Sequence, residues 1–74
     1  RLASTDVYIG LETTNSVSVK VQLYSAMGAR VLEMETKASA FDPIHLDVST
    51  LAPGRYTAVL EYNGVTRRVR VIKY

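Results

Sequence analysis

The chain has 74 residues, enough for one small domain with a single hydrophobic core. Its hydrophobic fraction of 47% is typical of globular chains and excludes a disordered one. The absence of Cys excludes disulfides and thiolate metal sites, and no apolar run approaches the roughly 18 residues of a membrane-spanning helix. The chain starts at Arg1 without a signal-peptide pattern, so we expect it to be a piece of a longer protein.

Apolar and polar residues alternate along most of the chain, which is typical of strands with one buried face. The alternation is cleanest in residues 17–24, where β-branched residues fill the apolar positions. Residues 37–40 have a weak pattern and are interpreted as a loop; residues 37–41 would be a seventh strand if they contributed one. The predicted strands are residues 7–11, 17–24, 31–36, 44–48, 56–62 and 65–74.

Three turn signals separate these strands. Ser25 followed by Gly28 predicts a type I turn that ends in a left-handed glycine. Pro53-Gly54 predicts a type II turn, and Asn63-Gly64 predicts a two-residue hairpin. Short strands divided by turn residues predict an all-β, immunoglobulin-like antiparallel β-sandwich of six to seven short strands. We expect residues 1–74 to form one domain, in which residues 1–16 are either a linker or a first strand.

The segment from Leu51 to Tyr56 resembles the tyrosine corner of immunoglobulin-like sandwiches. In that motif a Tyr hydroxyl bonds an upstream backbone group and fixes the crossover between the sheets. We expect Leu51 to enter the core, the Pro53-Gly54 turn to follow, and Tyr56 to lock the corner.

Positive charge is concentrated in the last predicted strand. Residues 62–74 contain Arg67, Arg68, Arg70 and Lys73 but no acid. The alternation predicts that Val65, Val69 and Val71 face the core and that Arg68 and Arg70 face outward. Two interpretations stay open and are compatible: charges that protect an edge strand from aggregation, and a docking surface for an acidic partner.

The sequence offers little for catalysis. His45 is the only His, and Asp47 and Ser49 lie near it in sequence without the strained turn that exposes a nucleophile. Glu33 and Glu35 share the outward face of a predicted strand, the ordinary place for carboxylates on an antiparallel sheet. We therefore predict that the chain is not an enzyme and has no metal site or cofactor.

Nucleic-acid binding is also unexpected. Proteins that bind single strands combine a basic groove with exposed aromatic platforms. Here Tyr56 and Tyr62 fall on the predicted inner face, so no stripe of interleaved basic and aromatic residues forms.

Three segments together resemble a known family. Residues 21–32, 46–56 and 67–73 contain, in order, an apolar strand with a turn that closes on Gly, an L-x-x-G-x-Y corner and a basic-apolar final strand. This series is similar to the type A C-terminal sorting domain of the type IX (Por) secretion system of Bacteroidetes, over residues 17–73. Ser25, where the family often has Asp, and Tyr74, after the usual terminal Lys, depart from the pattern.

The resemblance implies a secretion signal. Such domains fold in the periplasm and direct an exported cargo through the type IX outer-membrane translocon, so that the cargo reaches the cell surface or is secreted. The implied partners are the translocon or a shuttle protein and a cell-surface sortase that cuts upstream of the domain and joins the cargo to anionic lipopolysaccharide.

The resemblance also assigns roles to residues. The final strand would be the recognised segment, and we expect Arg68 and Arg70 to contact the receptor while Val69 and Val71 anchor the strand. The residues assigned to translocon recognition are Arg67, Arg68, Val69, Arg70, Val71, Ile72 and Lys73. The residues assigned to the supporting scaffold are Gly28, Leu51, Gly54, Tyr56, Asn63 and Gly64.

Two other functions stay open. The chain could be an immunoglobulin- or fibronectin-like spacer or binding module of a surface protein. It could also be a retained sorting domain of the attachment machinery that binds lipopolysaccharide. An exposed strand edge leaves a dimer open as well.

Overall fold

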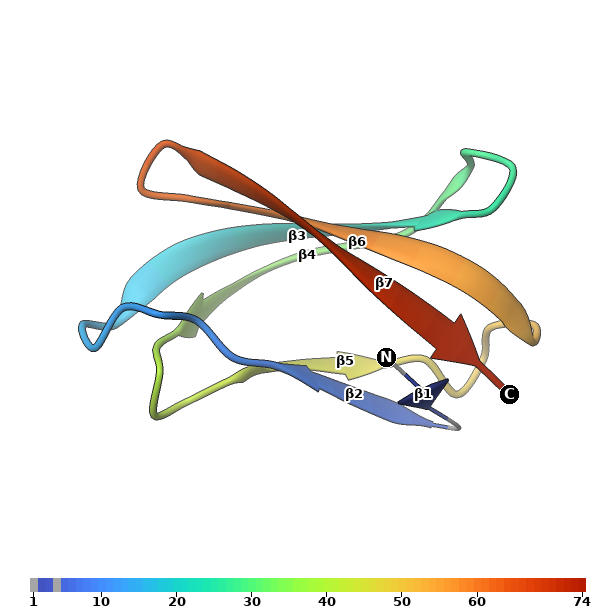
Figure 1. The fold of residues 1–74 in the computed structure, drawn as a ribbon, viewed down its shortest axis with the longest axis horizontal. Coiled ribbons are helices and arrows are strands. Elements are labelled where there is room, and N and C mark those ends of the chain that lie inside the picture. The colour runs from blue at the N-terminus through green and yellow to red at the C-terminus, as the bar shows by residue number, and fades with distance from the viewer. Residues whose placement is uncertain (1, 4) are drawn as a thin grey trace.

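The computed structural model describes residues 2–3 and 5–74, and in this part of the chain it contains seven strands and no helix. Five strands form one sheet in the order β1-β7-β6-β3-β4, and β2 and β5 form a second sheet beneath it (Figure 1). The strands are β1 (Leu2–Ala3), β2 (Asp6–Ile9), β3 (Val17–Ser25), β4 (Arg30–Ala38), β5 (Ile44–Asp47), β6 (Gly54–Tyr62) and β7 (Val65–Lys73).

The two sheets make the predicted all-β sandwich, with one departure from antiparallel pairing. Strands β3, β4, β6 and β7 pair antiparallel, as do β2 and β5. The short β1 runs parallel to β7, where Leu2 lies opposite Ile72 and Ala3 opposite Lys73. Residues 1–16 therefore contribute β1 and β2, although residues 1 and 4 lie outside the described part of the chain.

The core lies between the sheets and comes from alternate positions of each strand. In β3 the side chains of Val19, Val21 and Leu23 are fully buried, and those of Ile44 and Leu46 meet them from the other sheet. Each such side chain contributes about 1.5–3 kcal/mol through removal of its apolar surface from water. The period of two seen in the sequence is thus the direct result of one sheet face meeting the core.

Both predicted hairpin turns are confirmed. The Gly28 amide donates to the Ser25 carbonyl at 2.9 Å, and Gly28 has a φ of 84°. Asn63 and Gly64 have φ values of 50° and 71°, as a two-residue type I′ turn requires, and Tyr62 pairs with Val65 across it. These turns set the register of β3 with β4 and of β6 with β7.

The turn before β6 was predicted at the wrong place. The hydrogen-bonded turn lies at residues 48–51, where the Leu51 amide donates to the Val48 carbonyl at 3.1 Å. Gly54 has a positive φ, as expected, but its value of 154° is far from the roughly 80° of a type II turn. Gly54 already belongs to β6 and pairs with Lys73, so sheet pairing has extended its backbone.

The tyrosine corner forms as predicted. The Tyr56 hydroxyl donates to the Ala52 carbonyl at 2.5 Å, and its ring is buried. Leu51 is half-buried and packs against the core. This contact ties the loop that enters β6 to the strand itself.

Strand boundaries differ from the prediction by up to two residues, and two of these differences change what was expected of a segment. Lys37 and Ala38 belong to β4 because Ser18 and Val17 of β3 pair with them, so the expected loop begins only at Ser39. The first predicted strand ends at Ile9, although Leu11 beyond it is still buried.

Replacement of Tyr56 by Phe should lower the free energy of unfolding by about 0.5–1.5 kcal/mol, because the buried ring stays and only its hydrogen bond is lost. Tyr24→Phe is the matched control, since among the described residues the Tyr24 hydroxyl bonds the Gln22 side chain alone, at 3.3 Å. It should change stability by less than about 0.5 kcal/mol. Equilibrium unfolding in urea measures both, and equal losses in the two variants would argue against a locked corner.

Candidate functional site

Strand β7 presents two faces of different character. Its inner face carries Val69, which is half-buried, and Val71, which is 1% exposed. Val65 was expected on this buried face but is 47% exposed, because β7 begins beyond the cover of the two-stranded sheet. The valines that anchor the strand are therefore Val69 and Val71.

Arg67 shares the inner face with these valines, at the end of the sandwich where the core stops. Its guanidinium Nη1 lies 2.9 Å from a Glu12 carboxylate oxygen and 3.4 Å from the Gly10 carbonyl. The Tyr62 hydroxyl and then the Glu12 charge raise the pKa of Arg67 above its ordinary value. Arg67 thus clamps the start of β7 to the loop that follows β2.

The assignment of Arg67 to receptor recognition remains a prediction, and in the structure its guanidinium contacts Glu12 and Gly10. Its position was readable from the sequence, since Arg67 has the same strand parity as Val69 and Val71. The sequence could not show that the Arg67 guanidinium pairs with the Glu12 carboxylate, because Glu12 lies near the opposite end of the chain.

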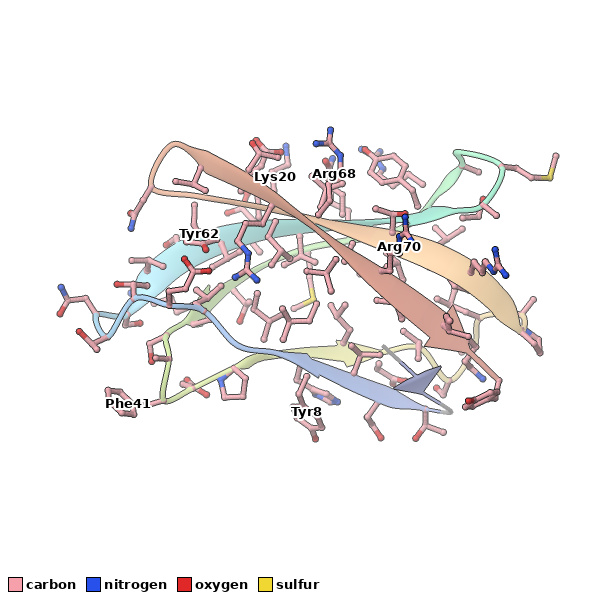
Figure 2. All side chains as sticks on the ribbon, in the orientation of Figure 1. Tyr8, Lys20, Phe41, Tyr62, Arg68 and Arg70 are labelled. Atoms are coloured by element: carbon pink, nitrogen blue, oxygen red, sulfur yellow. The ribbon has the colours of Figure 1, made fainter. Side chains whose placement is uncertain are left out.

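The outer face of β7 carries Arg68 and Arg70. Both project away from the two-stranded sheet, on the same side as Lys20 (Figure 2). In the pairing with β6, Arg68 lies opposite Val59 and Arg70 opposite Thr57, so neither faces a carboxylate across the strand pair. Arg68 has no ion pair or hydrogen bond to the rest of the described chain.

Acidic and basic side chains occupy different parts of this outer sheet face. At the β4 side, Glu33 lies 3.9 Å from the Lys20 ammonium and 3.5 Å from the Arg30 guanidinium, and it accepts a hydrogen bond from Gln22 at 3.1 Å. The β7 side holds Arg68 and Arg70 and has no acidic residue of its own, whereas Lys20 and Arg30 lie near Glu33 at the far side. The basic residues of β7 on this face therefore lie apart from the Glu33 cluster.

Arg55 is a further basic residue of the same outer face, and it was not among the residues predicted to contact a receptor. It lies on the outer face of β6, directly opposite Ile72 of β7. The sequence could have predicted this pairing, because a two-residue hairpin fixes the register of its strands. Arg55 and Ile72 lie the same number of residues from the Asn63-Gly64 turn.

The described part of the chain leaves β7 partly unpaired at its other edge. Strand β1 covers only Ile72 and Lys73, so residues 65–71 have no neighbour on the side away from β6. The residues that flank a two-residue hairpin exchange backbone hydrogen bonds, and those bonds alternate along the strand. Thr66, Arg68 and Arg70 therefore direct their backbone N–H and C=O groups toward this open edge.

The polar groups around His45 do not form a nucleophile–base arrangement. His45 Nε2 lies 2.6 Å from Asp6 Oδ1, and its ring stacks on Tyr8 with centroids 4.8 Å apart. Asp47 instead accepts a 3.0 Å hydrogen bond from the Ser49 amide. The Ser49 hydroxyl and then this amide lower the pKa of Asp47, so Asp47 orients Ser49 and not the imidazole.

Among residues 2–3 and 5–74, no group of three or more His, Cys, Asp or Glu side chains is arranged to hold a metal ion. No helix there is long and apolar enough to cross a membrane.

Arg67→Gln should lower the free energy of unfolding by about 0.5–1.5 kcal/mol, because it removes the clamp to the Gly10–Glu12 loop. Arg68→Gln, one position along on the open face, should stay within about 0.5 kcal/mol of the parent. A double-mutant cycle with Glu12→Gln isolates the Arg67–Glu12 pair. A zero coupling energy would show that the pair does not hold the strand.

The pKa of Asp6 lies below the usual 3.8 because His45 and then Thr5 bond its carboxylate. A lowered carboxylate pKa stabilises the fold above the ordinary Asp value, and this stability is lost as the pH falls through the lowered pKa. We expect His45→Phe, which keeps an aromatic ring against Tyr8, to raise the Asp6 pKa toward 3.8. Titration by carbon NMR measures it, with Ser49→Ala as a control that should move the pKa of Asp47 alone. An unchanged Asp6 pKa in His45→Phe would contradict this assignment.

The comparison with family models supplies the identity of the domain. Residues 3–73 match the model described as the secretion system C-terminal sorting domain, which covers nearly the whole chain. No significant match was found among curated proteins or among solved structures. The match confirms the resemblance drawn from the three sequence segments, and the chain belongs to the family of type IX secretion C-terminal sorting domains.

Proposed function

We propose that this chain carries its cargo to the type IX translocon by displaying β7 to a receptor of the secretion machinery. Membership of the family makes the chain a type IX sorting signal, which implies contact with that machinery and export to the cell surface or the medium. The observation that supports β7 as the recognised element is the coincidence of an open strand edge with an outward basic face at Arg68 and Arg70.

An open edge is a binding site for another strand. An extended segment of a partner can add to β7 through the backbone groups of Thr66, Arg68 and Arg70. The side chains of Arg68 and Arg70 would then stand beside those of the added strand, so a partner with acidic residues at alternate positions is favoured. The same charges oppose pairing between two copies of β7, since like charges on neighbouring strands repel.

The rest of the fold holds β7 rigid enough to be recognised. Val71 is buried, Arg67 is clamped to Glu12, and β6 pairs with the strand along its whole length from Gly54–Lys73 to Tyr62–Val65. A strand fixed before binding loses less conformational entropy on association than a flexible tail. This favours recognition of a folded domain.

In this proposal the domain folds in the periplasm and is recognised there by a translocon component or shuttle. A cell-surface sortase then acts upstream of the domain. Lipopolysaccharide is the acceptor of the cargo in that step, not the ligand of β7.

The test uses a reporter cargo fused to residues 1–74 in a type IX-competent cell. Deletion of residues 71–74 should abolish surface display, and so should Arg68→Glu with Arg70→Glu, which leaves the core valines in place. We expect at least a tenfold drop, measured as protease-accessible reporter on intact cells.

The control is Arg30→Glu with Lys37→Glu, an equal change of charge on β4 at the other edge of the same face. This variant should be displayed like the parent, and thermal unfolding should show that both double variants are folded. Normal surface display of the reporter in both the deletion variant and the β7 double variant would refute the sorting role of β7 and favour a spacer module.

A further inference from the structure

A hollow of about 440 Å³ opens on the outer face at the C-terminal end of β7. Four of its lining residues form a two-by-two block, with Arg55 opposite Ile72 and Thr57 opposite Arg70. Ala26, in the turn between β3 and β4, closes the hollow from the side. The two arginines therefore occupy diagonal corners of the block.

The diagonal placement suits one small anion. Diagonal neighbours on adjacent strands lie about 7–8 Å apart, so their long side chains can converge on a group held between them. A carboxylate can accept charge-assisted bonds of about 2.7–2.9 Å from two guanidinium groups at once. The Arg55 guanidinium has no hydrogen bond or ion pair to any other residue that the structure describes.

The rest of the lining favours a carboxylate on an aliphatic stem. Thr57 and Ile72 are half-buried, and Ala26, Tyr56 and Val71 complete the lining. Such a surface packs against the methylene groups of an acidic side chain and offers little to the many hydroxyls of a sugar. Of the β7 residues that line the hollow, Ile72 pairs with β1, but Arg70 lies on the open stretch of the edge. A strand added beside Arg70 would bring alternate side chains to the same face.

We propose that this hollow binds the carboxylate of an Asp or Glu side chain from the secretion-machinery protein that pairs with β7. The inference rests on the proposed function. It adds to that function a defined binding site, here called the socket, in which Arg55 and Arg70 bind one carboxylate. Arg55 is then a binding residue on a strand that the sequence assigned only to the scaffold.

The first experiment replaces Arg55 by Gln in the reporter fusion. We expect a five- to tenfold loss of surface display with unchanged thermal unfolding, because the Arg55 side chain has no partner within the described fold. Arg55→Lys should restore part of the loss, since Lys keeps the charge but not the forked geometry. Arg30→Gln, on the same face outside the hollow, should be displayed normally.

The second experiment identifies what enters the hollow. A photo-crosslinking residue, p-benzoylphenylalanine, replaces Ala26 in the fusion, and the crosslinked product is analysed by mass spectrometry after irradiation of intact cells. We expect a crosslink to a peptide of a secretion-machinery protein with an Asp or Glu near the attachment point, and its yield should fall when Arg55→Gln is added. The same crosslinker at Lys37 should not trap this peptide.

The outcomes separate this inference from the sorting role. If the β7 variants block display but Arg55→Gln does not, the socket is refuted and the sorting signal stands. A crosslink to a glycan or lipid, or no crosslink that depends on Arg55, also overturns the socket. If neither the β7 variants nor Arg55→Gln affects display, both proposals fail.

Discussion

The register between β6 and β7 is the constraint on which the rest of the structure depends. The Asn63-Gly64 turn pairs Tyr62 with Val65 and carries this pairing to Gly54 and Lys73 at the far end. A slip of one residue would turn every side chain of β7 to the opposite face. Val71 would then meet water and the outward arginines would meet the core, at a cost of several kcal/mol for each buried charge. One turn therefore decides which side chains of β7 pack in the core and which face outward.

The two faces of strand β7 differ in character: the inner face closes the core, and the outer face carries basic side chains beside an open strand edge. On the inner face, Val69 and Val71 pack against the core. Beyond the cover of the second sheet, Arg67 on the same face pairs with Glu12. The outer face carries positive charge that protects the open edge from a second copy of itself. In the proposed function, the same side chains would both oppose self-pairing and attract an acidic partner.

Local features of the sequence were predicted correctly because they rest on local physics. The alternation in β3, the glycine at position 28 and the Asn63-Gly64 turn each act within a few residues. The predictions that failed concern contacts between distant segments. Gly54 was assigned to a turn because its neighbour is Pro53, but pairing with Lys73 drew it into β6. Lys37 was predicted to lie in a loop, but its pairing with Ser18 of β3 places it in β4.

The sequence by itself determined the fold class, the hairpin turns, the basic outer face of β7 and, through three ordered segments, the secretion family. Alternation and turn chemistry suffice for this because each strand responds to its own period of two. Only the tertiary structure decided that Val65 lies beyond the second sheet, that Arg67 meets Glu12, and that Arg55 shares a hollow with Arg70. These features depend on where one sheet ends over the other and on which strands become neighbours, and no local pattern contains that information.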